Sequence, residues 1–429
     1  MNCSWYGRAF GRRVLRPESR LPKADSARSN ASRCAYNLAV GFNYFHYART
    51  VFRPVGLESV FLFVTSNCNS RCRTCFYWDE LNQGRDLSFA QLETLSRTAP
   101  EFHKLWISGG EPFMRKELAE IIELFYANNG VRHVNLPTNG PLPEKLESVI
   151  ATLLERCPEL VIDLNFSLDG LANTHDAIRG VPNNFEKTLA TLDMAAGKWK
   201  GVRRLRRNVV TCVTAENYRE LVELGLKMMR ETESDGHYFE IIRGSPMDES
   251  LKRLPREELA ALHRRLMFFH QRYAERLFVH LPAIPRALAR AYYLGNIKFH
   301  FDIHEQNHYN KKAWPMACMA GQSTIVIDHD GHFRACELRP KLGRLQEFDF
   351  NLSAALASSQ MRNEVKAIPG ARCWCTHSCW IHTSSKFSPK ALLFHIPWAY
   401  LKSRWQRLPQ TDIADWERFR VTDAPNLAS

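Results

Sequence analysis

Short apolar runs alternate with amphipathic stretches from Ser59 to about Arg243. The runs predict six strands, "SVFLFVT", "KLWIS", "RHVNLPTNG", "LVIDLNFSLDG", "RRNVVTCVT" and "HYFEIIRG". The stretches between them, such as "KELAEIIELFYANN" and "YRELVELGLKMMRE", repeat apolar residues at helical spacing. Because the strands are apolar enough to be buried, the α/β pattern predicts a parallel sheet, either closed into a full or partial barrel or open and doubly wound.

Distinctive residues follow four of the predicted strands. Cys68 follows the first strand, Gly109 the second, Asn139 the third and Asp169 the fourth. In parallel α/β proteins the chemistry lies at the carboxyl ends of the strands. We therefore expect the functional residues at this edge of the sheet.

Differences in composition divide the chain outside this core into an N-terminal arm, a linker, a cysteine-bearing unit and a C-terminal tail. Residues 1–57 form a basic arm with nine Arg and one Lys against two acidic residues, and residues 35–52 are aromatic enough for an interfacial helix. After the core at 58–250 we expect a helical linker at 251–312, helical over 255–294, and a cysteine-bearing unit at 313–385. A basic aromatic tail occupies 386–429. It predicts either an interfacial segment or an ordinary packed helix that breaks at Pro397.

Composition bounds the class of protein and its compartment. Hydrophobic residues make up 45% and charged residues 24% of the chain, as in soluble globular proteins. The chain has no apolar run of about 18 residues and no apolar segment typical of a secretory signal. A cytoplasmic location is therefore predicted, with peripheral membrane contact as a further expectation. The net charge of +13 suits an anionic partner, such as a membrane surface, a nucleic acid or an acidic peptide.

The loop "VTSNCNSRCRTCFYW" sets Cys68, Cys72 and Cys75 within eight residues. Zinc usually takes four ligands, and neither a second cysteine knuckle nor a His pair is near this loop. An iron–sulfur cluster normally takes four thiolates, so three would leave one iron open to a chelating small molecule. Half of a zinc site remains the alternative. Cys157 and Cys212 lie in apolar segments and are expected in the core.

The loop resembles the CxxxCxxC signature of the radical S-adenosylmethionine (radical SAM) enzymes. Five further motifs carry the resemblance, whose core covers roughly Ser59 to Pro246. "SGGEP" is similar to the methionine-binding turn of the family, "TNG" to its third-strand motif and "FSLDG" to its fourth-strand segment. "HDAIRG" and "VTAEN" resemble elements of the branch that carries additional clusters.

The resemblance implies a partial (β/α)6 barrel in which a 4Fe–4S cluster lies on the three thiolates. S-adenosylmethionine would chelate the open iron and, after one electron from a flavodoxin- or ferredoxin-type donor, yield a radical that abstracts hydrogen from substrate. Cys68, Cys72 and Cys75 are then the catalytic residues. The implied cofactor-binding residues are Phe76, Ser108, Gly109, Gly110, Glu111, Asn139, Ser167, Asp169 and Arg243.

The resemblance also implies a particular role for several of these residues. Gly109 and Gly110 would let the backbone approach the cofactor closely. Glu111 offers a carboxylate to its ammonium group, with the backbone as the alternative, and Arg243 would pair with its carboxylate. The aromatic residue that the family often has before the third cysteine is Thr74 here, so Phe76 is expected to take its place beside adenine.

A second cysteine set follows. Cys318 and Cys336 flank "STIVIDHDGHFRA", which predicts a hairpin because apolar runs flank a His-Asp-Gly turn. "CWCTHSC" adds three more cysteines, and these residues alone also fit a zinc ribbon. The Cys-x12-Gly-x4-Cys spacing resembles a SPASM or twitch extension, which implies one auxiliary 4Fe–4S cluster. We expect Cys318, Cys336, Cys375 and Cys379 as its ligands, with Cys373 as the alternative and His377 as a competitor.

The resemblance implies an oxidation or cross-linking reaction on a peptide or a small-molecule natural product. A lipid- or glycan-linked substrate close to a membrane is the alternative. From other classes, a zinc-binding interaction protein without turnover also fits the cysteines. An RNA-modifying enzyme fits the charge, but the chain has no aromatic–basic RNA module, so nucleic acid is not expected as a partner.

Overall fold

The computed structural model describes residues 56–370 and 374–405, all within one compact unit. Four expectations lie outside the described residues, wholly or in part: the basic arm almost entirely, the interfacial helix over 35–52, the position of Cys373, and the tail beyond residue 405. The boundaries predicted between the parts of the chain remain predictions.

Six parallel strands form the core, in the order of the sequence. Each strand pairs with the next through a parallel register, and β6 forms one edge of the sheet, so the barrel is open. The predicted partial (β/α)6 barrel is therefore confirmed. The strands are β1 (Ser59–Thr65), β2 (Lys104–Gly109), β3 (His133–Thr138), β4 (Val161–Ser167), β5 (Leu205–Val213) and β6 (Gly236–Ile241).

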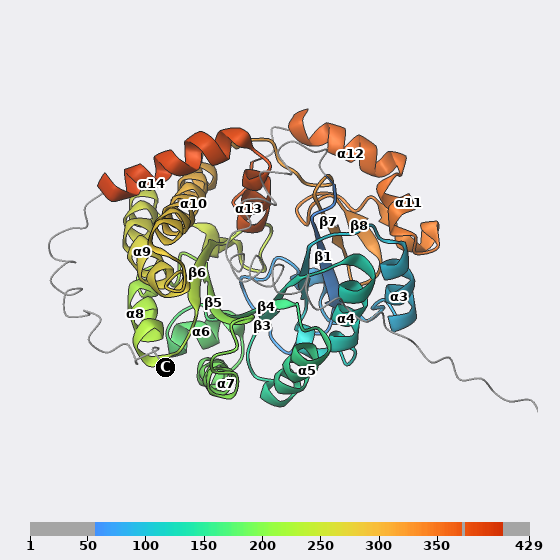
Figure 1. The fold of residues 1–429 in the computed structure, drawn as a ribbon, viewed down its shortest axis with the longest axis horizontal. Coiled ribbons are helices and arrows are strands. Elements are labelled where there is room, and N and C mark those ends of the chain that lie inside the picture. The colour runs from blue at the N-terminus through green and yellow to red at the C-terminus, as the bar shows by residue number, and fades with distance from the viewer. Residues whose placement is uncertain (1–55, 371–373, 406–429) are drawn as a thin grey trace, which may run out of the picture. The chain divides into compact units, whose positions relative to one another are not determined.

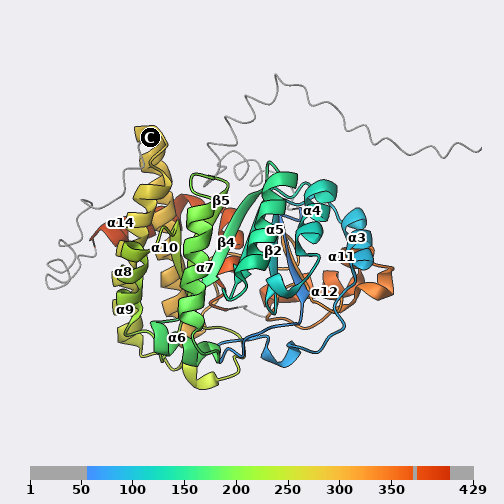
Figure 2. The same cartoon turned by 90° about the horizontal axis from the view of Figure 1, so that it is seen from below.

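Amphipathic helices follow the strands and cover one face of the sheet (Figures 1 and 2). The first of them begins where the Ser88 hydroxyl accepts from the Gln91 N–H and the Gln91 side chain accepts from the Ser88 N–H, which is a capping box. The helices are α3 (Phe89–Thr98), α4 (Leu118–Asn129), α5 (Pro143–Arg156), α6 (Ala172–Arg179), α7 (Asn184–Lys198) and α8 (Leu221–Glu231). Short 3-10 turns lie at Trp78–Glu80, Pro112–Met114, Glu249–Lys252 and Leu345–Phe348.

The opposite, inner face of the sheet carries charged groups, which the apolar runs did not predict, beside aromatic rings such as those of Phe61 and Trp106. Lys104, His133, Asp163 and Arg206 come from four adjacent strands and share this face, because successive side chains alternate between faces. Asp163 pairs with His133 Nε2 and with Arg206 Nε, each at 2.5 Å. Burial lowers the pKa of Lys104 to about 7, although Asp163 acts in the opposite direction.

The C-terminal cysteine unit extends the same sheet beyond β1. Strand β7 (Thr324–Ile327) runs parallel to β1, and β8 (His332–Arg334) returns antiparallel to β7 after a turn in which Gly331 has φ +89°. Strand β9 (Gly343–Arg344) completes the edge. The predicted hairpin is therefore confirmed, and its pairing with β1 places the second cysteine set beside the core.

Helices of the C-terminal half complete the described structure. The region expected to be helical over 255–294 contains α9 (Arg256–Leu277) and α10 (Ala283–Asn310). Helices α11 (Leu352–Leu356) and α12 (Ser359–Gly370) follow the hairpin. Helix α13 (Ser378–Lys386) lies on the inner face of the sheet (Figure 1). Its Trp380 stacks on Phe61 of β1, with the ring centroids 4.4 Å apart.

The tail forms a π-helical segment (Ala391–His395) that continues into α14 (Ile396–Trp405), and it packs against α10. Pro397 does not break the helix. The π-helical segment runs directly into α14, so the helix is continuous through Pro397. Among the helices of the described residues, none is both long and apolar enough to cross a membrane.

Candidate functional site

The three thiols of the cysteine loop lie close together at the carboxyl end of β1. Burial raises the pKa of Cys75 to about 12, with a smaller contribution from the neighbouring Cys72 thiol. Burial also raises the pKa of Cys68 to about 11. Thiols that are desolvated beside one another hold their protons unless a cation replaces them. The arrangement therefore suits a cationic metal centre on this loop.

The double-glycine turn after β2 supports the backbone of the cysteine loop directly. Gly110 N–H donates to Thr65 O and Glu111 N–H donates to Asn67 O, each at 2.8 Å. A Cβ atom on Gly110 would lie 2.1 Å from Asn67 O, and one on Gly109, which has φ +114°, would lie 2.3 Å from Thr65 O. The two glycines are therefore required by the close approach of this turn to the cysteine loop, where the sequence analysis expected a close approach to the cofactor.

Glu111 braces the ends of two neighbouring strands. Its carboxylate accepts from Asn139 N–H at 2.7 Å, from the Thr138 hydroxyl at 3.1 Å and from Phe113 N–H at 3.2 Å. Burial raises the pKa of Glu111 to about 7, although these hydrogen bonds lower it. Since these bonds occupy both oxygens, the structure favours the backbone alternative for contact with a cofactor.

Asn139 clamps the cysteine loop from the end of β3. Its amide nitrogen donates to Asn69 Oδ1 at 2.6 Å and to Ser70 Oγ at 2.8 Å. Its Oδ1 is buried and has no hydrogen-bond partner among the described residues. A buried unpaired oxygen at this position fits a bound ligand that donates a hydrogen bond.

Arg179 connects the cysteine loop to Asp169. Its Nη1 donates to Cys72 Sγ at 3.6 Å, and its Nη2 pairs with Asp169 Oδ2 at 2.8 Å. The Arg179 carbonyl also accepts from Arg71 N–H at 3.1 Å. The "HDAIRG" motif was singled out in the sequence analysis, but Arg179 was given no role. Its position at the end of a helix that follows Asp169 could have indicated an ion pair between the two residues.

Asp169 is fully buried and is engaged by the protein. Besides its pair with Arg179, its Oδ1 accepts from Cys212 N–H at 2.8 Å. Cys212 was expected in the core with Cys157. Cys157 is fully buried, but Cys212 is only partly buried, and the charged groups that act on it include Asp169 and Arg243.

Ser108 and Ser167, at the ends of β2 and β4, are partly exposed, and their hydroxyl groups have no hydrogen bond within the described residues. Phe76 follows the third cysteine and lies 5.2 Å below the guanidinium of Arg243. Arg243 Nε in turn donates to Glu337 Oε1 at 3.2 Å. Arg243 is therefore engaged by a residue that directly follows Cys336, and together they connect the two cysteine sets.

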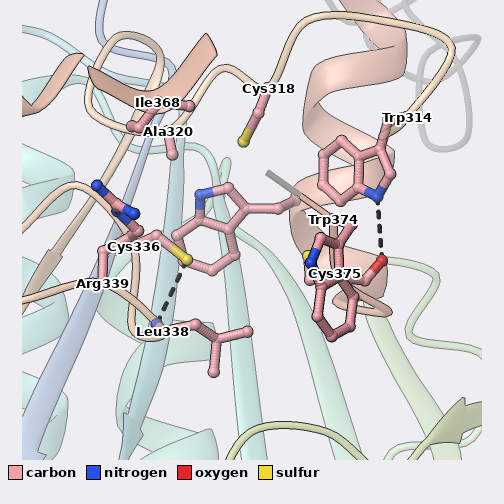
Figure 3. A pocket seen from close by; sticks show the side chains of 10 residues that line it. Trp314, Cys318, Ala320, Cys336, Leu338, Arg339, Ile368, Trp374 and Cys375 are labelled. Atoms are coloured by element: carbon pink, nitrogen blue, oxygen red, sulfur yellow. Dashed lines mark hydrogen bonds between the residues drawn. The ribbon is translucent and has the colours of Figure 1, made fainter. Parts of the chain in front are cut away.

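Cys318, Cys336 and Cys375 come from three segments and line one cavity of about 270 Å³ (Figure 3). Burial raises the pKa of Cys336 well above its usual range, and the nearby Cys375 and Cys318 act in the same direction. The indoles of Trp314, Trp374 and Trp380 form much of the wall, and Trp314 Nε1 donates to Cys375 O at 3.0 Å.

Cys379 does not line this cavity, which differs from its expected place among the ligands. Cys379 lies in the first turn of α13, where each residue turns by about 100° from the next, and it is Trp380 that faces the cavity. The charged groups that act on the Cys379 thiol are Glu240, Arg243, Glu337 and Lys104. His377 does not line the cavity either, and its Nε2 lies 2.7 Å from Glu337 Oε1.

Among the described residues, no group of three or more His, Cys, Asp or Glu side chains converges on a single metal ion. A four-iron cluster places its thiolates on different irons, so it needs a wider arrangement than one ion does.

Comparison with known proteins agrees with the geometry of the loop. Residues 62–227 match the family model described as the Radical SAM superfamily. The chain contains a radical SAM domain. The matched segment begins in β1 and ends within α8, so it includes the cysteine loop and the four strand ends described above.

Curated relatives match over the same part of the chain. GTP 3′,8-cyclase of Xanthomonas campestris pv. campestris (strain 8004) is 29% identical over 194 residues, which are 43% of this chain and 54% of that protein. Pre-heme d1 synthase of Dinoroseobacter shibae is 29% identical over 184 residues, 41% of either chain. The chain thus spans about half the length of the curated relatives it matches.

A solved structure shares the fold over more of the chain. Native anSMEcpe with bound AdoMet and the Cp18Cys peptide has a TM-score of 0.52 at 17% identity, covering 81% of this chain and 95% of that one. The likeness shows that the two chains share a fold, and it extends beyond the segment that matches the family model.

Proposed function

We propose that this chain is a radical SAM enzyme that abstracts hydrogen from its substrate and passes an electron to one auxiliary cluster. The observation that carries the proposal is the loop of three adjacent thiols, held by Asn139 and Arg179 at the carboxyl end of an open parallel barrel. A 4Fe–4S cluster with S-adenosylmethionine supplies, when bound, a radical made by one-electron cleavage of the sulfonium.

Cys68, Cys72 and Cys75 would hold this cluster, and other residues of the chain position the cofactor. Ser108 and Ser167 offer hydroxyls that have no hydrogen bond within residues 56–370 and 374–405, and the turn at Gly109 and Gly110 offers backbone groups. Phe76 would lie beside the adenine. Asn139 Oδ1 would accept a hydrogen bond from the cofactor. Glu111 and Asp169 would instead support the residues that contact the cofactor, because their carboxylates already bind other groups of the protein.

For the auxiliary 4Fe–4S cluster we propose Cys318, Cys336, Cys373 and Cys375 as ligands. Three of them line one cavity, and Cys373 is only two residues from Cys375. Cys379 is then the remaining thiol. Four protein ligands leave no iron open, so this cluster would accept electrons rather than bind substrate.

The proposed substrate is a peptide or a small molecule that is oxidised or cross-linked, with a lipid- or glycan-linked molecule as the alternative. The names of the relatives support small molecules, and the peptide held by anSMEcpe supports a peptide in an enzyme of this fold. A flavodoxin- or ferredoxin-type protein would supply the electron.

The test is anaerobic reconstitution of the full chain with iron and sulfide. We expect about eight irons per chain, because two four-iron clusters are proposed. Replacing Cys68, Cys72 and Cys75 together with Ala should remove about half of the iron and all formation of 5′-deoxyadenosine. Replacing Cys318 and Cys336 with Ala should remove the other half and leave cleavage of the cofactor intact.

Cys379→Ala is the matched control for the ligand set. It should keep all the iron, whereas Cys375→Ala should lose the auxiliary cluster. A colourless protein that holds zinc would contradict the proposal and favour the interaction protein. Cleavage of the cofactor by the triple variant would contradict the assignment of the loop.

A further inference from the structure

The outer surface of the tail helix has an unusual distribution of side chains. Five large apolar residues of the π-helical segment and α14 are 45–69% exposed: Leu393, Phe394, Trp398, Leu401 and Trp405. Phe394, Trp398, Leu401 and Trp405 follow one another at spacings of four, three and four, so they lie on one face of the helix. We call these five residues the aromatic face.

Two alanines and one isoleucine attach the helix to the protein. Ala391, Ile396 and Ala399 are buried, and a Cβ atom on Gly295 of α10 would lie 2.5 Å from Ile396 O. The backbones of α10 and α14 therefore approach closely. An ordinary surface helix buries its large apolar residues and exposes its polar ones. This helix buries Ile396 but exposes five other large apolar residues, so its packing against α10 does not explain the aromatic face.

Exposed basic residues occur on the same helix as the aromatic face. Residues 386–405 contain four basic residues and no Asp or Glu, and of these Lys386 is buried whereas Lys390, Lys402 and Arg404 are exposed. Lys402 lies 3.5 Å from Asp302 of α10. A basic surface that also exposes tryptophan is complementary to an anionic lipid bilayer, where indole rings settle at the headgroup level.

We propose that the aromatic face docks this protein on an anionic membrane surface. The helix lies on the bilayer rather than crossing it, in agreement with the absence of a membrane-spanning helix among the described residues. Trp398 and Trp405, whose rings meet edge to face at 5.9 Å, would enter the headgroup region together. Lys390 and Arg404 would contact the lipid phosphates. This inference goes beyond the proposed function and does not depend on it.

The test uses the full-length reconstituted protein and vesicles of phosphatidylcholine, with and without a quarter of phosphatidylglycerol. We expect flotation with the anionic vesicles. Replacing Phe394, Trp398 and Trp405 with Ser should lower the partition coefficient at least about tenfold, because aromatic surface is then no longer buried in lipid. Lys390→Gln with Arg404→Gln should lower binding to anionic vesicles about fivefold per residue and leave neutral vesicles unaffected.

Ile284→Ser with Leu288→Ser is the matched control. These side chains of α10 are 75% and 63% exposed, but they lie in the first two turns of that helix and outside the aromatic face. The control should bind vesicles like the wild type, and all variants should keep their iron and melting temperature. Unchanged flotation of the aromatic variant would overturn the proposal. The proposal would also be overturned if the wild-type protein did not bind vesicles but formed a dimer, and if Trp398→Ser converted that dimer to a monomer.

Discussion

The two cysteine sets are held in opposite ways. Hydrogen bonds from the ends of other strands hold the loop of Cys68, Cys72 and Cys75, through the Asn139 amide, the Arg179 guanidinium and the turn at Gly110. By contrast, a wall of indoles encloses Cys318, Cys336 and Cys375.

The difference matches the chemistry proposed for each set. A site that must admit a polar, charged cofactor benefits from polar groups at fixed positions, some of them left unpaired. A site that only stores and passes an electron benefits from an apolar wall that excludes water. The predictions below test whether the two sets behave independently.

The largest effect is expected from Gly110→Ala. The new Cβ would lie 2.1 Å from Asn67 O, so the turn and the cysteine loop must separate. We expect loss of about half of the iron, all from the loop, while the auxiliary cluster remains. Iron analysis with EPR spectroscopy measures both. Gly197→Ala in α7 is the control, because a Cβ there meets nothing within 4 Å. Full iron content in Gly110→Ala would show that the loop tolerates the displacement.

Arg179→Gln should affect the loop cluster through its charge. A buried guanidinium beside Cys72 favours the reduced, more negative cluster, and its removal also leaves Asp169 without its ion pair. At a fixed potential we expect about a tenfold lower ratio of reduced to oxidised cluster, measured by EPR redox titration. Arg73→Gln is the control, since Arg73 lies on the same loop but pairs with Glu216 and Asp248. An equal shift in both variants would refute a specific role for Arg179.

Lys104 tests the polar inner face of the sheet. Its pKa falls from its ordinary value to about 7, chiefly through burial, so folding disfavours the charged amine. Its contribution to stability is therefore present above pH 10 and is lost as the pH falls toward 7. As the pH falls from 9.5 to 7, the free energy of unfolding of Lys104→Met should rise by about 1 to 3 kcal/mol relative to that of the wild type. Denaturant unfolding at the two pH values measures this difference, and a constant difference would contradict it.

The smallest effect is expected from Trp314→Phe. It removes the hydrogen bond from Nε1 to Cys375 O, at a cost of about 1 kcal/mol, and should leave the loop cluster unchanged. Trp374→Phe is the control, because that indole is 41% exposed at the same cavity and no such bond is found for it. Thermal unfolding measures both variants. Loss of loop iron in Trp314→Phe would show that the two sets are coupled.

Local patterns in the sequence were sufficient for the strand order, the hairpin and the residues at the strand ends. Strand runs with helices between them permit few topologies, and a motif such as "SGGEP" can be recognised at a strand end, although its turn packs on Thr65 and Asn67. The inner face was harder to predict. The polar residues Lys104 and Asp163 stand inside apolar runs, and only the pairing of strands shows that they share one face with Arg206.

The sequence by itself determined which thiols are available and which of them are neighbours along the chain. The tertiary structure decided which of them meet. Cys375 and Cys379 are four residues apart, yet only Cys375 lines the cavity with Cys318 and Cys336, because the first turn of α13 directs its side chains around the helix axis. It also decided that Arg179 reaches Cys72, a contact across 107 residues that no spacing in the sequence encodes.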